Sequence, residues 1–182
     1  MFRWDVMGLS DAEMYDRMKN GWKMGLPFTA CGNGSTLEAT KNAREWLPKI
    51  AKQYSIVTVS DAGAGDMAWI RSIHWDVDYT PYDLVPRLDE VIKFDITKDI
   101  LPAADLILCR MVLNHIQENI DSAVERIKES GSAFLIATQF DNALSRTRQF
   151  QRLDLRLYFG DYIESVQDGN EEACKLALWS IH

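Results

Sequence analysis

Short runs of apolar residues alternate with amphipathic stretches along most of the chain. The short runs are rich in β-branched residues, and such runs predict strands that are buried on both faces, as in a parallel sheet. The stretches between them carry apolar residues at helical spacing and predict helices. This alternation predicts an α/β fold with a Rossmann-like, mostly parallel sheet. The predicted strands lie at 56–60, 78–83, 91–95, 106–109 and 133–138.

One helix is predicted before these strands and two between them. A capping box opens the first, over residues 35–46, and Pro48 should end or kink it. The second follows the first strand, over residues 66–73. The third covers residues 116–127, and Gly131 stops it.

The connection between the second and third strands is too short for a helix of normal length. Only the seven residues 84–90 separate Asp83 from Val91, whereas a right-handed parallel crossover takes about a dozen or more. We therefore expect a single helical turn or no helix there, and a rudimentary third strand.

Both ends of the chain extend this α/β body. Runs at 161–166 and 174–181 flank the turn sequence Asp168-Gly169-Asn170 and predict a C-terminal antiparallel hairpin that closes the sheet. A capping box and apolar residues at helical spacing predict a helix near the N-terminus. We expect a helical N-terminal extension over residues 1–34 and a ligand-binding domain over 35–182.

Composition and charge argue against several classes of protein. The net charge of −7 disfavours a nucleic-acid partner, because phosphate contacts need clustered Lys and Arg. Cys31, Cys109 and Cys174 are widely spaced and form no Cys-x-x-Cys pair, so they indicate neither a disulfide framework nor a zinc site. The start of the chain lacks a signal-peptide pattern, and no apolar run approaches the roughly 20 residues of a membrane span. We therefore expect a cytoplasmic protein with no metal and no membrane segment.

The first buried strand runs into a glycine-rich loop, 61–66, of sequence DAGAGD. Gly63 and Gly65 let a ligand approach the backbone without a Cβ in the way, and the N–H groups that open the next helix would face that ligand. The loop with Ala68 also fits the dinucleotide fingerprint, and Asp83, 18 residues beyond Gly65, would then bind a ribose. A tight turn that binds no ligand is the simpler alternative.

Acidic residues around this loop distinguish two kinds of nucleoside ligand. Asp61 ends a buried strand, where an unpaired carboxylate is costly, and Asp66 follows the glycines. Both would repel the pyrophosphate of a nicotinamide dinucleotide, but both would attract the ammonium and sulfonium groups of S-adenosylmethionine. Asp83 suits a ribose diol, and Asp95 is placed to accept a hydrogen bond from an adenine amino group. The four acids favour S-adenosyl-L-methionine as the cofactor.

These residues resemble the cofactor motifs of class I S-adenosylmethionine-dependent methyltransferases. The loop 61–66 is similar to the first motif of that family, Asp83 matches its ribose-binding acid, and Asp95 matches its residue near adenine. The segment 34–40 is similar to a small bacterial and phage methyltransferase-like subgroup. The resemblance spans about residues 32–182 and implies the class I methyltransferase fold.

The segment after the fourth strand carries a further part of the resemblance. It implies that Cys109 and Arg110 contact the cofactor and that Arg110 and His115 are the catalytic candidates, His115 as a general base with an ordinary pKa near 6.5. A histidine packed against the sheet is an equal alternative. Asn114 is placed either to bind a polar acceptor or to cap the following helix. Met111 stands where the family commonly has Asp.

The stretch 141–160 replaces the helix that usually follows the fifth strand. Leucines alternate with polar residues over 153–159, which predicts an extended segment. The stretch concentrates positive charge, either to recruit an anionic acceptor or as a solvated face. Its arginines are Arg146, Arg148, Arg152 and Arg156.

The sequence therefore predicts an S-adenosylmethionine-dependent methyltransferase that acts on a small-molecule or peptide acceptor, an anionic one if the arginines bind it. A DNA-base methyltransferase is disfavoured because no Asn-Pro-Pro-Tyr motif follows the fourth strand. Two alternatives remain open. One is a non-catalytic S-adenosylmethionine-binding module or a subunit of a larger enzyme, and the other is an NAD-dependent oxidoreductase.

Overall fold

One seven-stranded sheet organises the protein. The computed structural model describes residues 31–116, 119–141, 153–169 and 173–181, so the predicted extension over 1–34 lies mostly outside the described residues. The strands follow the order β3-β2-β1-β4-β5-β7-β6 across the sheet. They are β1 Thr58–Ala62, β2 Asp78–Asp83, β3 Ile92–Lys93, β4 Leu106–Cys109, β5 Phe134–Phe140, β6 Glu164–Gln167 and β7 Cys174–Ser180.

The sheet is mostly parallel, as predicted. Strands β1 to β5 pair parallel to one another, whereas β7 runs antiparallel between β5 and β6. The predicted hairpin is therefore confirmed, and it closes one edge of an α/β sheet. Strands β2 and β4 have the predicted bounds; β1 begins and ends two residues later than predicted, and β5 begins one residue later and ends two residues later.

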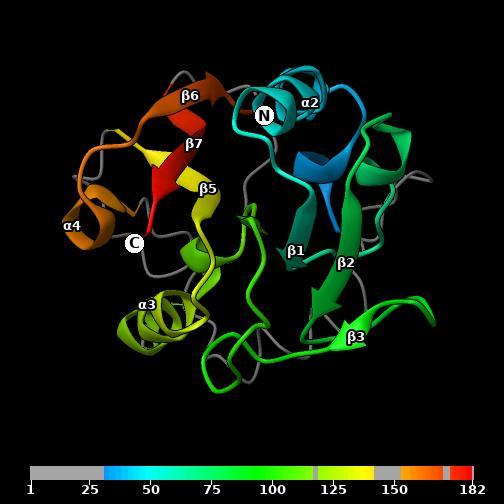
Figure 1. Ribbon diagram of the computed structural model, residues 1–182. Coiled ribbons are helices and arrows are strands. Elements are labelled where there is room, and N and C mark those ends of the chain that lie inside the picture. The colour runs from blue at the N-terminus through cyan, green and yellow to red at the C-terminus, as the bar shows by residue number, and fades with distance from the viewer. Residues whose placement is uncertain (1–30, 117–118, 142–152, 170–172, 182) are drawn as a thin grey trace, which may run out of the picture.

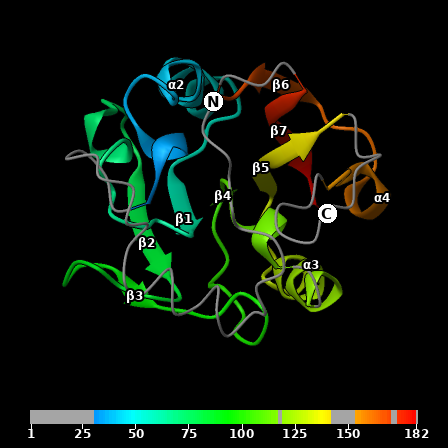
Figure 2. The ribbon, with the colours of Figure 1, turned by 180° about the vertical axis from the view of Figure 1, so that it is seen from behind.

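Two helices cover opposite faces of this sheet (Figures 1 and 2). Helix α2, Lys41–Gln53, packs on one face with Leu108 and Ile136, and helix α3, Ile120–Glu129, packs on the other with Ile107. Every residue of β4 is buried, because neighbouring side chains on a strand point to opposite faces and both faces are covered. Apolar packing therefore occupies both faces, and polar chemistry is left to the strand ends.

Helix α2 differs from its predicted bounds. It begins at Lys41, after a turn in which the Thr36 hydroxyl accepts a hydrogen bond from the Ala39 N–H, and it continues through Pro48 to Gln53. Its buried face includes Leu47 and Ile50, on either side of the proline. Packing of that face outweighs the hydrogen bond that proline cannot donate, so the predicted end of the helix at residue 46 was wrong, and Pro48 does not end it.

The predicted helix over 66–73 is also absent. Only a 3₁₀ turn, Ile70–Ser72, forms there. Gly65 has φ +60° and Met67 has φ +55°, both in the left-handed region, and that conformation cannot continue a right-handed helix. The prediction from sequence spacing missed this backbone reversal.

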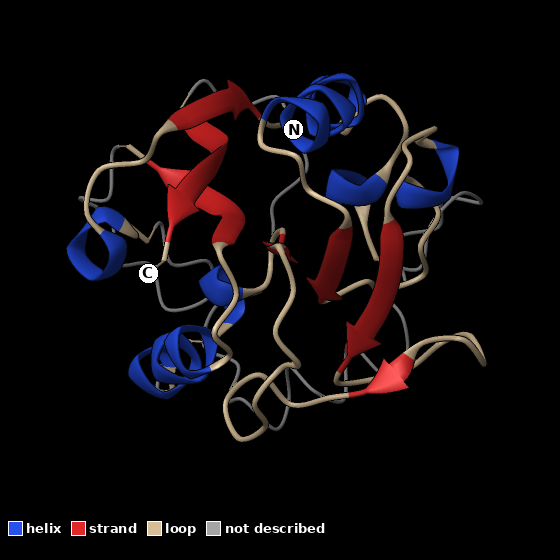
Figure 3. Cartoon of the chain, in the orientation of Figure 1, coloured by secondary structure: helices blue, strands red, loops and turns tan. Residues whose placement is uncertain are grey.

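A loop replaces the usual crossover helix after β2 (Figure 3). No helix lies between β2 and β3 among the residues 84–91, and β3 has only two residues, as the short connection predicted. The stretch 153–159 was predicted to be extended, but it forms a single helical turn, α4 Arg156–Phe159. Helix α3 is confirmed, with Gly131 just beyond it at φ +71°.

We expect replacement of Pro48 by alanine to stabilise the protein by about 2 kcal/mol. Alanine restores an N–H donor in the helix interior, a gain of about 3 kcal/mol that the greater freedom of the unfolded chain reduces by about 1 kcal/mol. Urea unfolding measures the change. The matched variant Lys49→Ala, at the exposed neighbouring position, should stay within about 0.5 kcal/mol. Equal effects of the two substitutions would contradict this account of the helix.

Candidate active site

The carboxyl ends of β1, β2 and β4 gather three of the predicted site residues. Asp61 lies near the end of β1, Asp83 ends β2, and Arg110 follows β4; all three residues are buried, with 3%, 8% and 6% of their surface exposed. Both Asp83 and Arg110 lie close enough to shift the pKa of Asp61 electrostatically. The sheet therefore brings charged groups together at one edge, where open α/β sheets bind ligands.

Asp61 has a partner that the sequence argument did not identify. The hydroxyl of Tyr79, on the neighbouring strand β2, donates a hydrogen bond to the Asp61 carboxyl. Burial raises the pKa of Asp61 to about 7, and the charge of Asp83 adds to the rise, whereas the Tyr79 hydroxyl and the Arg110 guanidinium oppose it. Burial therefore destabilises the charged form of Asp61, and a bound cationic group would stabilise that form.

The N–H groups of the glycine loop are already used within the protein. The amides of Gly63 and Ala64 donate to the Tyr82 carbonyl at 2.8 and 3.0 Å, and the Gly65 amide donates to Asp83 Oδ2 at 2.8 Å. The Asp66 amide donates to the Cys31 thiol at 3.2 Å. The sequence argument expected these donors to face a ligand, but here they fasten the loop to β2 and to the segment before α2.

Both glycines of the loop are required by close packing. Gly63 has φ +115°, and a Cβ there would lie 2.1 Å from Cγ2 of Val112. Gly65 has φ +60°, and a Cβ there would lie 2.5 Å from Sγ of Cys31. The absence of a Cβ therefore lets protein side chains approach the loop, which is a different reason from the ligand approach that the sequence suggested.

Asp66 and Asp95 lie in local turns. Asp66 Oδ1 accepts from the Ala68 amide at 3.1 Å. Asp95 follows β3, and its carboxylate accepts from Thr97 and from Lys98 Nζ at 2.7 Å. Although partial burial works against it, the bonds from Lys98 and Thr97 lower the pKa of Asp95. Asp95 is a charged carboxylate beside β2 and β3, with both oxygens bonded to its own turn.

Arg110 forms a buried ion pair that joins distant parts of the chain. Its Nη2 donates to Asp168 Oδ1 at 2.9 Å and to the Gly34 carbonyl at 2.8 Å, and its Nε lies 2.9 Å from Asp168 Oδ2. The guanidinium also lies over the indole of Trp69, 5.2 Å from the ring centroid. The Arg110 side chain is 4% exposed and that of Asp168 is 0% exposed. Arg110 therefore links β4, the β6–β7 turn, the loop after β1 and the segment before α2.

The residues after Arg110 form a turn over the sheet edge. Met111, at φ +55°, donates its amide to the Thr138 hydroxyl of β5 at 2.8 Å, and a 3₁₀ turn, η3 Leu113–His115, follows. Burial lowers the pKa of His115 to about 4, so its imidazole is neutral at pH 7. Cys109, before Arg110, is fully buried in the core, so its side chain is not placed to contact a ligand.

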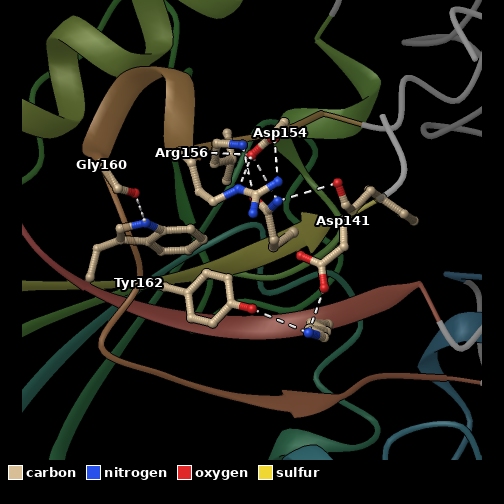
Figure 4. Close-up of polar contacts among 10 residues, drawn as sticks. Asp141, Asp154, Arg156, Gly160 and Tyr162 are labelled. Carbon is tan, nitrogen blue, oxygen red and sulfur yellow. Dashed lines mark hydrogen bonds and ion pairs between the residues drawn. The ribbon is translucent and has the colours of Figure 1, made fainter. Parts of the chain in front are cut away.

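Positive charge after β5 is paired with carboxylates (Figure 4). Arg156 binds Asp154 through Nε at 2.8 Å and Nη2 at 2.6 Å, and these bonds lower the pKa of Asp154 to about 2. Lys175, on β7, pairs with Asp141 and donates to the Tyr162 hydroxyl. The other arginines of the stretch, Arg146, Arg148 and Arg152, lie outside the described residues.

Two residues of this site, Tyr79 and Asp168, were missed from the sequence. Strand alternation contained a signal for the first, because the register pairs Asp61 with Pro81 and so places Tyr79 on the same face as Asp61. No local signal identified Asp168 as more than a turn residue, since it meets Arg110 across 58 positions of sequence.

A metal-binding cluster and a membrane-spanning helix are both absent from the part of the chain that the structure describes. No group of three or more His, Cys, Asp or Glu side chains is placed there to hold a metal ion. Over the same residues, no helix has the length and apolar character needed to cross a membrane.

We expect Asp61→Asn to stabilise the ligand-free protein above pH 7 and not at pH 4. The folded-state pKa of Asp61 is raised to about 7, so the wild type loses stability relative to the asparagine variant as the pH rises from about 4 to 7. The difference reaches at most about 4 kcal/mol and is constant above pH 7. Urea unfolding of both proteins from pH 4 to 8 measures it, and a difference independent of pH would contradict the buried, raised carboxyl.

Substitution of one member of the Arg110–Asp168 pair should destabilise the protein more than substitution of both members together. Arg110→Met leaves the Asp168 carboxylate charged and buried without its partner, and Asp168→Leu does the same to the Arg110 guanidinium. Each substitution should lower the free energy of unfolding by about 3–5 kcal/mol. The double variant should recover more than half of the summed loss. Denaturant unfolding of all four proteins completes the cycle, and additive losses would mean that the two side chains do not act as a pair.

Solved structures of other proteins share the fold of this chain. No family model matches the chain, and no curated protein matches it. The N-methyltransferase NodS from Bradyrhizobium japonicum WM9, solved with S-adenosyl-L-homocysteine, has a similar structure with a TM-score of 0.64 and 14% identity, over 93% of this chain and 96% of that chain.

Two further solved structures have the same architecture. The 1,6-didemethyltoxoflavin-N1-methyltransferase of Burkholderia thailandensis has a TM-score of 0.60 and 13% identity over 93% of this chain and 86% of that chain. A SAM-dependent methyltransferase from Aquifex aeolicus has a TM-score of 0.56 and 15% identity over 96% of this chain and all of that chain. The strand order, the antiparallel β7 and these similarities agree, and the chain has the Rossmann-like fold of S-adenosylmethionine-dependent methyltransferases.

Proposed function

We propose that this protein is an S-adenosylmethionine-dependent methyltransferase that acts on a small-molecule or peptide acceptor. The observation that carries the proposal is Asp61, a carboxyl 3% exposed beside a second acid, Asp83, at the end of β1. Two neighbouring buried acids are unfavourable unless a cation joins them. The ammonium group of S-adenosylmethionine supplies that cation.

The described residues fit such a cofactor. Asp61 would hold the ammonium group, and Asp83 would accept from the ribose hydroxyls, since its two carboxylate oxygens have lone pairs beyond those bonded to Gly65 and Val85. Asp95 would serve the adenine amino group in the same way. Gly63, Gly65 and Asp66 would shape the loop, and Cys109 and Arg110 would border the cofactor beyond β4.

His115 and Arg110 have distinct roles in the proposal. When bound, S-adenosylmethionine would supply a methyl group whose carbon is attacked by a nucleophile of the acceptor, with S-adenosylhomocysteine as the leaving group. With a pKa of about 4, His115 is a weak base at pH 7, so it orients an acceptor by hydrogen bonding and removes a proton only at a high energetic cost. Arg110, held by Asp168 and Gly34, fixes the position of the turn that carries His115.

The oxidoreductase alternative is disfavoured by the loop itself. A dinucleotide pyrophosphate needs several backbone N–H donors at the start of a helix. The amides of residues 63–66 donate to Tyr82, Asp83 and Cys31, and a 3₁₀ turn replaces the helix. Asp61 adds a negative charge where that pyrophosphate would lie.

A non-catalytic binding module is the second candidate. Met111 stands where the resembling family commonly has Asp, and its amide is bonded to Thr138. Binding of the cofactor would be retained in such a module, whereas methyl transfer would be absent.

We also propose a cytoplasmic location and membership of the bacterial and phage subgroup. The location is supported by Cys31, Cys109 and Cys174, none of which forms a disulfide among the described residues. The subgroup is supported by the similarity of the segment 34–40.

Calorimetric titration tests the proposed cofactor. S-adenosylmethionine and S-adenosylhomocysteine should bind, and NAD should not. Asp61→Ala should weaken the binding of S-adenosylmethionine and of S-adenosylhomocysteine by about 30-fold or more, because the buried ammonium group of each loses its partner. The matched variant Asp76→Ala, at an exposed position, should leave both affinities unchanged. Binding of NAD alone, or an unchanged affinity in Asp61→Ala, would overturn the proposal.

Transfer of a radiolabelled methyl group to a panel of amines, hydroxyl compounds and short peptides then separates enzyme from module. Turnover of any acceptor supports the methyltransferase. Tight binding of S-adenosylmethionine without transfer to any member of the panel favours the non-catalytic module.

A further inference from the structure

Asn114 is a buried amide without a hydrogen-bond partner. Its side chain is 2% exposed, and neither Oδ1 nor Nδ2 is hydrogen-bonded to any residue that the structure describes. Buried polar side chains are nearly always bonded, and an unbonded one destabilises the protein that carries it. An asparagine can donate two hydrogen bonds through its nitrogen and accept two through its oxygen. Its donors and acceptors are therefore left for a group that binds from outside the described chain, a water or a ligand.

A capping role does not explain it. Asn114 is the middle residue of the 3₁₀ turn η3, and the N-cap position of α3 is Asn119, five residues later. The sequence argument left open whether Asn114 caps that helix or binds an acceptor. Since its amide is bonded to no described backbone group, the acceptor alternative is the one that remains.

The turn that carries Asn114 spans the candidate site. Val112, two residues before it, packs against Gly63 of the loop after β1, and the Met111 amide bonds Thr138 on β5. The turn η3 itself packs against β5. Asn114 thus lies on the β5 side of the edge where Asp61 and the glycine loop gather, beyond the acids proposed to hold the cofactor.

Three cations that the structure describes after β4, after β5 and on β7 are paired with carboxylates. Arg110 is bonded to Asp168, Arg156 to Asp154, and Lys175 to Asp141. Each of these charges is balanced inside the protein. Among the residues that the structure describes near β4 and β5, Asn114 has a neutral amide with neither atom hydrogen-bonded, and this amide offers a donor and an acceptor side by side.

We propose that Asn114 binds the methyl acceptor, and that this acceptor presents a neutral edge with an adjacent hydrogen-bond donor and acceptor, as in a lactam, a carboxamide or a nitrogen heterocycle. A carboxylate would satisfy Nδ2 but would repel Oδ1, whereas an amide-type edge satisfies both. The inference rests on the proposed function, because it assigns the second substrate of that reaction.

The test uses 2-pyridone as the probe and N-methyl-2-pyridone, which lacks the N–H donor, as its matched control. Full-length ¹⁵N-labelled protein saturated with S-adenosylhomocysteine is titrated with each compound. We expect 2-pyridone to bind with a Kd of about 1–10 mM and at least about five-fold more tightly than the methylated control. The Asn114 side-chain N–H signals, assigned by their loss in Asn114→Leu, should shift on binding of 2-pyridone only.

The variant Asn114→Leu gives a second and independent measurement. Removing an unbonded buried amide should raise the Tm of the ligand-free protein by about 3–6 °C, while the preference for 2-pyridone disappears. Asn42→Leu, the same change at an exposed position of α2 where the amide donates to the Gln167 carbonyl at 3.2 Å, should leave the preference for 2-pyridone unchanged and should not raise the Tm.

Three outcomes would overturn the inference. Equal binding of the two pyridones by the wild type would show that no amide edge is recognised. A lower Tm in Asn114→Leu would show that the amide is bonded in the ligand-free protein. A ten-fold loss of S-adenosylhomocysteine affinity in that variant would assign Asn114 to the cofactor. If S-adenosylhomocysteine does not bind the wild type at all, the proposed function fails first, and the two failures are thereby distinguished.

Discussion

The buried ion pair between Arg110 and Asp168 is the contact on which the arrangement of the site depends. It joins the end of β4 to the β6–β7 turn, and through the Gly34 carbonyl and the Trp69 ring it also reaches the segment before α2 and the loop after β1. A charge this deeply buried is tolerated only when its partner is fixed. Each of these four segments therefore constrains the others.

The rest of the site follows from how the sheet is covered. Helices α2 and α3 bury both faces, so charged side chains find room only at the strand ends (Figure 1). Asp61 and Asp83 meet there because β1 and β2 are parallel neighbours that end at the same edge. Burial raises the pKa of Asp61 and the charge of Asp83 adds to the rise, whereas the Tyr79 hydroxyl and the Arg110 guanidinium only partly oppose it. The fold itself thus creates a place that favours a cation.

Bonded and unbonded polar groups at this edge point to different ligands. The backbone amides of the glycine loop are bonded within the protein, which removes the donors that a phosphate would need. The amide of Asn114 is buried and lacks a partner among the described residues. Acids on one side of the edge and a neutral amide on the other fit a cationic cofactor beside an uncharged acceptor edge.

The sequence by itself determined the fold class and most of the sheet. An apolar run predicted the bounds of β4, and the short connection after Asp83 predicted the reduced β3, because burial on two faces and the length of a crossover are local constraints. It also singled out Asp61 and Asp83 as acids at strand ends. The prediction of these features requires only the periodicity of apolar residues and the lengths of the connecting segments.

Only the tertiary structure decided the remaining contacts. Pro48 stays inside α2 because the packing of Leu47 and Ile50 outweighs a local rule, and the expected helix after Asp66 is lost to the left-handed backbone at Met67. The pairing of Arg110 with Asp168, and the isolation of Asn114, involve residues that are distant in sequence or contacts that are missing. Periodicity reports the face on which a side chain lies, but not the group that it meets there.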